Sequence, residues 1–106
     1  MEIPEESDFQ VLVQDRWELD SFDLIDLKKV LTEKVKDLIS NDFHRLVNIL
    51  YRLDVAETVL SEAMSRDNLD DSASFLAHKI LEREIIRYKY RKLYQKKPDD
   101  YFPEID

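Results

Sequence analysis

The residues best suited to acid–base or metal chemistry in this chain are its two histidines, His44 and His78. Neither histidine has a second histidine or a cysteine at the spacing that protein metal sites use. His78 precedes Glu82 by four residues, and a solvated pair on one helix face is the commonest role for such a spacing. We therefore predict no metal centre, no cofactor and no catalytic residue, so that the chain is not an enzyme.

One carboxylate, Glu84, falls among apolar positions of a long helical pattern. A buried carboxylate needs a cationic partner, and Arg45 or Arg52 of an earlier helix could supply it. We predict a structural ion pair. A catalytic pair with Glu57 or Glu62 is the alternative, but the sequence does not place these groups within the roughly 10 Å that such chemistry tolerates.

Two residue types are missing altogether, and each absence excludes classes of function. The chain of 106 residues has no glycine, so it has no glycine-rich phosphate loop, no dinucleotide-binding fingerprint and no nucleophile elbow. It also has no cysteine, which excludes disulfides and thiolate chemistry and agrees with a cytoplasmic location. Because glycine is the usual residue at positive φ, few tight turns are expected, which favours an all-α fold.

Residues 87–97 interleave cations with tyrosines. Residues 79–97 contain eight Lys or Arg and two Glu, which gives this stretch a net charge of +6. Because the whole chain has a net charge of −8, the remaining residues carry −14. The pattern fits a protein interface with aromatic anchors and a cationic rim, and we predict self-association or a protein partner. The alternative is a regulator that binds nucleic acid, which is less favoured because the acidic remainder repels a polyanion. The candidate residues are Tyr88, Tyr90, Leu93 and Tyr94 as anchors, with Arg87, Arg91 and Lys92 beside them.

A short segment, residues 98–106, combines acidic and large apolar side chains. Its aromatic pair, Tyr101 and Phe102, could dock into the groove of a partner while the acids contact a basic rim. We expect the segment to fold back onto its own domain, with the acids facing the basic residues of the long helix. Tyr101 and Phe102 therefore belong to the candidate interaction surface.

The N-terminal residues 1–20 are predicted to form an extended or mobile arm, because apolar and polar residues alternate in 9–14. Trp17 and Phe22 are expected to anchor its end. The beginning of the chain lacks the apolar stretch of a signal peptide, and no segment is long and apolar enough to cross a membrane.

Four helices are expected in residues 21–97, which form one bundle domain. The first runs from Ser21 or Asp23 to Ser40, and the second covers 43–53 after the break at Asn41 and Asp42. A capping box at residues 54–57 predicts a third helix that begins at residue 55. Residues 66–71 are predicted to form a loop. The fourth begins at 71 or 72 and continues for about 25 residues, near 37 Å, until Pro98.

The fourth helix has apolar residues on two sides. One face holds Leu76, Ala77, Ile80, Leu81, Ile85 and Tyr88, and the other holds Ile86, Tyr90, Leu93 and Tyr94. The C-terminal half should therefore project from the bundle with an apolar face of its own, which requires a second surface.

Residues 42–57, followed by 80–84, resemble small, functionally uncharacterised bacterial helical proteins. The resemblance implies a helix, capping box and helix scaffold and transfers no activity. Taken together, the sequence predicts an all-α four-helix bundle with an extended N-terminal arm, a long C-terminal helix and an acidic aromatic tail. The expected function is that of a non-catalytic interaction or self-assembling module that acts through the late fourth helix and the tail.

Overall fold

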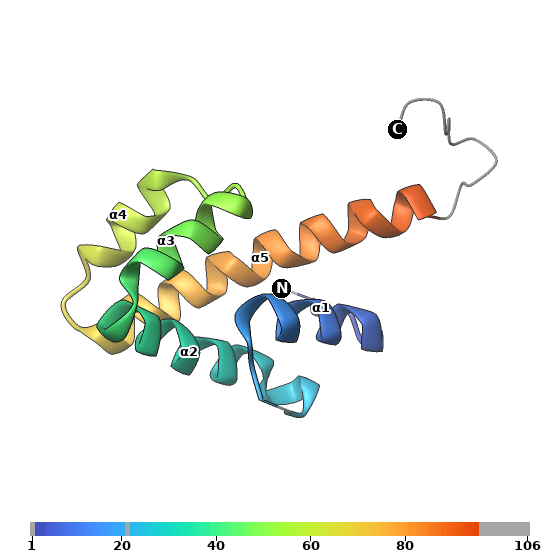
Figure 1. The fold of residues 1–106 in the computed structure, drawn as a ribbon, viewed down its shortest axis with the longest axis horizontal. Helices are drawn as coiled ribbons and strands as arrows, with labels where there is room; N and C mark the ends of the chain where they lie inside the picture. Colours follow the sequence, from blue (N-terminus) through green and yellow to red (C-terminus); the bar gives the residue numbers. More distant parts are fainter. Residues whose placement is uncertain (1, 21, 96–106) are drawn as a thin grey trace.

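The computed structural model describes residues 2–20 and 22–95, and all the regular structure in these ranges is helical (Figure 1). The all-α prediction is therefore confirmed for the described residues, which hold no strand. The elements in chain order are α1 (Ser7–Trp17), the 3-10 turn η1 (Leu24–Asp26), α2 (Leu27–Asn41), α3 (Phe43–Arg52), α4 (Glu57–Met64) and α5 (Leu69–Gln95).

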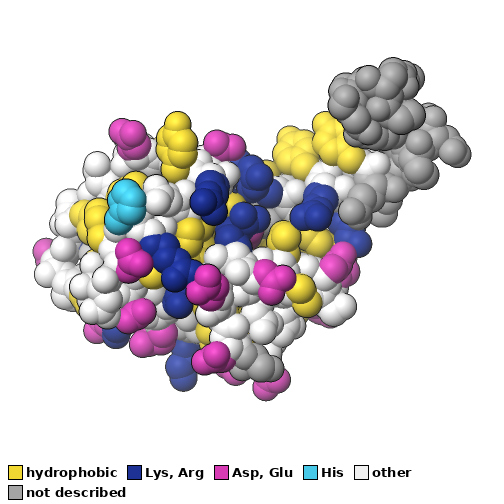
Figure 2. Space-filling view, in the orientation of Figure 1, with side chains coloured by type: hydrophobic (Ala, Val, Ile, Leu, Met, Phe, Trp, Pro, Cys, Tyr) yellow, Lys and Arg dark blue, Asp and Glu magenta, His cyan; other side chains and the backbone are white. Residues whose placement is uncertain are grey.

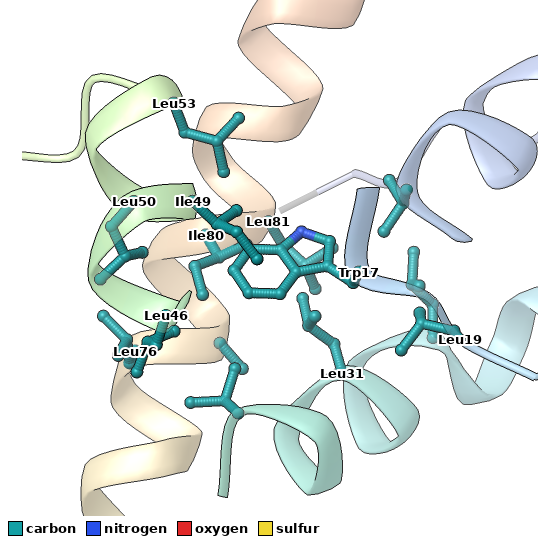
Figure 3. Packing of buried hydrophobic residues seen from close by; sticks show 14 of the residues in the cluster. Trp17, Leu19, Leu31, Leu46, Ile49, Leu50, Leu53, Leu76, Ile80 and Leu81 are labelled. Atoms are coloured by element: carbon teal, nitrogen blue, oxygen red, sulfur yellow. The ribbon is translucent and has the colours of Figure 1, made fainter. Parts of the chain in front are cut away.

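The longest helix, α5, is the axis against which α2 and α4 pack most extensively (Figure 1). On α2, apolar residues recur every three or four positions, and this row is buried against the rest of the core. The row consists of Leu27, Leu31, Val35 and Leu38. Figure 3 shows how side chains from α1, α2, α3 and α5 meet in one apolar cluster.

The prediction of an extended arm is wrong for Ser7–Trp17, which form the helix α1. Phe9, Val13 and Trp17 follow one another at intervals of four and are all fully buried. This spacing is a helical one, and burial against α5 outweighed the local alternation that had suggested a strand. The expected anchoring role of Trp17 is confirmed, since its indole lies within the apolar cluster (Figure 3).

The capping box predicted at residues 54–57 does not form. Asp54 instead ends α3 in a left-handed conformation with φ of 59°. The N–H of Val55 donates to the carbonyl of Leu50 at 3.0 Å, and that of Asp54 donates to Tyr51 at 3.1 Å. This pair of bonds is the Schellman motif, whose left-handed position is usually glycine. As a result, α4 begins only at Glu57 and lacks a side-chain cap.

The same motif closes α1, with Glu18 at the left-handed position and φ of 53°. The N–H of Leu19 donates to the carbonyl of Gln14 at 2.9 Å, and that of Glu18 donates to Asp15 at 3.3 Å. Two acidic residues thus stand where glycine is the preferred residue. A chain without glycine makes these helix ends at the cost of unfavourable backbone conformations.

Side-chain caps define the beginnings of α3 and α5. The break between α2 and α3 is confirmed, because the side chain of Asp42 caps α3 by accepting from the N–H of Arg45 at 3.2 Å. The last helix begins earlier than predicted, at Leu69. The side chain of Asn68 accepts from the N–H of Asp71 at 2.8 Å, so Asn68 caps α5 and the preceding connection is shorter than expected.

With 27 residues, α5 is about 40 Å long at 1.5 Å per residue. Its last turns extend beyond the other helices (Figure 1). In the described part of the chain, no helix has the length and apolar character needed to cross a membrane.

Replacing Asp54 tests the cost of its left-handed conformation. Asp54→Gly and Asp54→Ala both remove a carboxylate that is 73% exposed, but only alanine keeps a Cβ that clashes at positive φ. We expect the glycine variant to have the higher free energy of unfolding, by about 1 kcal/mol. Equilibrium urea denaturation measures the difference, and an alanine variant of equal or greater stability would contradict it.

Candidate protein-interaction surface

The two sides of α5 differ as the sequence predicted. The side facing the bundle is buried, with Leu76, Ala77, Ile80, Leu81, Ile85 and Tyr88 all 6% exposed or less. On the opposite side the exposed fractions are 43% for Ile86, 59% for Tyr90, 49% for Leu93 and 65% for Tyr94. We call these last four residues the apolar row. They recur at three- and four-residue intervals, so they lie along one side of the helix.

Two of the predicted surface residues of α5 make contacts with helix α1. Tyr88 is 4% exposed, its ring meets that of Phe9 edge to face with centroids 5.2 Å apart, and its hydroxyl donates to Asp8 Oδ1 at 2.6 Å. Lys92 Nζ lies 2.8 Å from Asp8 Oδ2. Tyr88 is thus a core residue and Lys92 is paired within the chain, so neither belongs to the candidate surface.

These contacts also shift the pKa values of Asp8 and Tyr88. The hydrogen bonds from Lys92 and Tyr88 hold the pKa of Asp8 below its ordinary value. Burial, followed by the bond to Asp8, raises the pKa of the Tyr88 hydroxyl. The carboxylate of Asp8 therefore stays ionised at neutral pH and joins the beginning of α1 to α5.

One turn earlier on α5 than Tyr88, the fully buried carboxylate of Glu84 receives its partners from the other end of α1. Arg16 Nε and Trp17 Nε1 both donate to Glu84 Oε2, at 2.8 and 2.9 Å. The structural ion pair predicted for Glu84 is present, but its cation is neither Arg45 nor Arg52. Arg45 pairs instead with Glu18. The correct partner could not be found from the sequence because residues 7–17 were not recognised as a helix.

The second oxygen of Glu84, Oε1, has no hydrogen-bond partner among the described residues. Burial raises the pKa of this carboxyl group, while Arg16 and Trp17 act in the opposite direction. A buried carboxylate with one unpaired oxygen is costly to ionise.

A groove of about 420 Å³ runs between α1 and the second half of α5. It adjoins the apolar row and shares two residues with it. Its lining contains four arginines and no acidic residue, and we call it the arginine groove. The lining residues are Leu12, Arg16, Arg83, Ile86, Arg87, Tyr90 and Arg91.

The arginines of the groove differ in the partners that their guanidinium groups have within the chain. Arg16 is fixed by Glu84, and Arg83 Nε donates to the carbonyl of Leu53 at 3.0 Å. Arg87 Nη1 lies 3.5 Å from a carboxylate oxygen of Asp54 that is largely exposed. Arg91 has no carboxylate within 4.0 Å in the part of the chain that the structure describes. Figure 2 shows Lys and Arg side chains gathered on this face of the molecule, beside hydrophobic side chains near the end of α5.

The remaining candidates for chemistry do not converge. His44 is exposed on α3, beside Asn48 and Arg52, and the His78 ring lies 3.6 Å from the exposed carboxylate of Glu82. Within residues 2–20 and 22–95, no three His, Asp or Glu side chains are grouped as metal ligands are.

Two acidic residues considered for a catalytic pair, Glu57 and Glu62, are exposed on α4, and neither is a hydrogen-bond partner of Glu84. Tyr101 and Phe102 lie outside the described residues. The predicted surface residues that the structure leaves exposed are Tyr90, Leu93, Tyr94, Arg87 and Arg91.

Comparison of the chain with models of protein families, with curated proteins and with solved structures gave no match.

Glu84→Gln tests whether the buried carboxylate is ionised at a cost. Glutamine keeps an acceptor for the Trp17 indole N–H but carries no charge. The pKa of Glu84 in the folded chain lies above its ordinary value of 4.5. At a pH between these two pKa values, the carboxyl group is protonated in the folded state and ionised in the unfolded state. The free energy of unfolding of the wild type, relative to the variant, should therefore fall as pH rises above about 4.5 and level off beyond the folded pKa.

Urea denaturation of both proteins between about pH 4 and pH 8 measures this difference, since the other titrating groups are common to the two chains. A stability difference that instead grows in favour of the wild type as pH rises would show that Arg16 outweighs burial and lowers the pKa of Glu84.

Proposed function

We propose that this chain is a non-catalytic helical interaction module that self-assembles through the apolar row of α5. The observation that carries the proposal is the exposure of four large apolar side chains, between 43% and 65%, on one side of a single helix. They are Ile86, Tyr90, Leu93 and Tyr94. From the first to the last they span about 12 Å, at 1.5 Å per residue, which is the scale of a helix–helix contact.

The chemistry of the row supports a protein partner. Tyrosine and arginine are enriched at the centres of protein interfaces, where an aromatic ring fills a pocket and a guanidinium reaches a carboxylate. Here Tyr90 and Tyr94 supply the rings, and Arg87 and Arg91 lie beside them on the same helix. A partner surface would thus need an apolar centre and an acidic rim.

A second copy of the chain has suitable charge for this role. Outside residues 79–97 the chain carries a net charge of −14, against +6 within them. This separation favours an approach in which the basic half of α5 faces the acidic part of another copy. Burying the row would also remove apolar surface from water, which is the main driving force of association.

Substitution of Tyr90 and Leu93 by serine tests the proposal. We expect the wild-type chain to form a discrete oligomer in sedimentation velocity and native mass spectrometry, and the variant to be monomeric. Truncating a hot-spot residue of an interface costs about 2 kcal/mol or more, so the double substitution should dissociate the assembly at micromolar concentration. Both side chains are about half exposed, so the helical circular dichroism should be unchanged.

The matched control is Tyr51→Ser with Ile25→Ser, which removes one tyrosine and one aliphatic residue that are 80% and 91% exposed outside α5. This control should assemble like the wild type. A wild-type chain that is monomeric at every concentration, or a Tyr90 and Leu93 variant that still assembles, would contradict the proposed function.

The arginine groove supports a second candidate function, the binding of nucleic acid along residues 87–97. Four arginines without an acidic neighbour in the lining can neutralise phosphates, and Tyr90 offers an exposed ring for stacking. Two observations count against it, since Tyr88 is buried and Lys92 is paired with Asp8.

Fluorescence anisotropy with a labelled single-stranded oligonucleotide tests this second candidate. Binding should weaken steeply as salt rises, with a log–log slope of about −0.7 for each phosphate neutralised. Arg87→Glu with Arg91→Glu should abolish it, whereas Lys28→Glu with Lys29→Glu makes the same charge change on α2 and should leave binding in place. Absence of binding at low salt would remove the candidate.

A further inference from the structure

We propose that the arginine groove is a binding site for the acidic segment 99–106 of the same molecule. The inference goes beyond the proposed function, because its occupant is the chain itself and its site is the groove. The segment carries four carboxylates, Asp99, Asp100, Glu104 and Asp106, and three large apolar side chains, Tyr101, Phe102 and Ile105.

The groove and the segment carry complementary charges. Arg83, Arg87 and Arg91 follow one another at intervals of four along α5, so their like charges lie on adjacent turns. Arg16 adds a fourth cation from α1, and Glu84 already occupies its Nε. The lining supplies no carboxylate of its own, and the largely exposed Asp54, which lies outside it, is within 4.0 Å of Arg83 and Arg87. An acidic strand laid along the groove would relieve this repulsion and could form bidentate pairs with the guanidinium groups.

The segment is long enough to reach the groove. Arg91 precedes Gln95 by four residues, which is about 6 Å along the helix, and Arg83 lies about 12 Å further back. Residues 96–98 leave up to about 10 Å of chain for reversing direction, and residues 99–106 extend over as much as about 26 Å. The acids at 99 and 100 can thus reach Arg91, while Glu104 can reach the earlier arginines.

The groove and the segment both contain large apolar side chains. Between its arginines the groove exposes Leu12, Ile86 and Tyr90. Tyr101 and Phe102 offer rings that can cover these side chains or stack on a guanidinium plane. A peptide with acidic residues alone would pair with the arginines but would leave the apolar side chains of the groove uncovered. Attachment to α5 also gives the segment a high effective concentration at the groove, which an independent acidic ligand lacks.

Paramagnetic relaxation enhancement in the full-length chain tests the proposal. The chain has no cysteine, so Asp106→Cys gives a single site for a nitroxide label while three carboxylates of the segment stay in place. The decisive signals are the amides of Leu12 and Arg16, because α1 is far along the sequence from the label. They should lose intensity relative to exposed positions on α2 such as Lys28, and high salt should restore them.

Charge reversal identifies the groove as the cause. In the labelled chain, Arg87→Glu with Arg91→Glu should remove the intensity loss at Leu12 and Arg16. Lys28→Glu with Lys29→Glu, which alters the charge equally on α2, should preserve it. Adding Asp99→Lys with Asp100→Lys to the arginine variant should bring the loss back, which also shows that the reversed groove is still folded.

Three outcomes would overturn the proposal. One is an unchanged signal at Leu12 and Arg16, and another is an intensity loss that survives reversal of the arginines. The third comes from mixing nitroxide-labelled, isotope-free chain with unlabelled ¹⁵N chain, because a loss seen equally in that mixture would place the segment of a second copy in the groove. Ile86 and Tyr90 belong to both surfaces, but none of these outcomes requires self-assembly, which sedimentation measures separately.

Discussion

The arrangement of this domain depends on the buried carboxylate of Glu84. Ionised and fully enclosed, it would be strongly unfavourable without the two donors that α1 brings to it. Arg16 and Trp17 are adjacent in the chain, yet they lie 68 and 67 residues away from Glu84. If α1 docked one turn out of register, the carboxylate would lose both donors and the indole would lose its acceptor. The interaction therefore acts mainly by fixing the position of α1 along α5, and it adds less to the free energy of unfolding.

That position determines which surface is left uncovered. With Trp17 fixed beside Glu84, Phe9 lies two turns away and meets Tyr88, while Asp8 reaches both Tyr88 and Lys92. Helix α1 thereby covers one side of the later α5. Ile86 and Tyr90 of the apolar row line the groove together with Arg16, whereas Leu93 and Tyr94 lie outside it. Both proposed surfaces are consequences of the same docking.

Periodicity located most of the elements but not the contacts between them. The row on α2, the break at Asp42 and the two sides of α5 follow from residue spacing, which acts within a single helix. Helix α1 was missed because Phe9, Val11 and Val13 also fit the two-residue spacing of a strand. The partner of Glu84 was missed as a result, since a contact across 68 residues cannot be read from local spacing. Likewise, Asp54 has the residue type of a helix N-cap, and only its left-handed backbone shows that it closes α3.

The absence of glycine and the distribution of charge are connected. Where glycine would normally end α1 and α3, the chain places Glu18 and Asp54, and each carries a carboxylate that a glycine would lack. Glu18 pairs with Arg45, which holds the pKa of the Glu18 carboxyl below its ordinary value. Asp54 lies within 4.0 Å of Arg83 and Arg87. These helix ends therefore neutralise part of the basic surface, but the exposed carboxylate of Asp54 contributes little to holding two arginines. The groove keeps an excess of positive charge, and an acidic occupant would remove it.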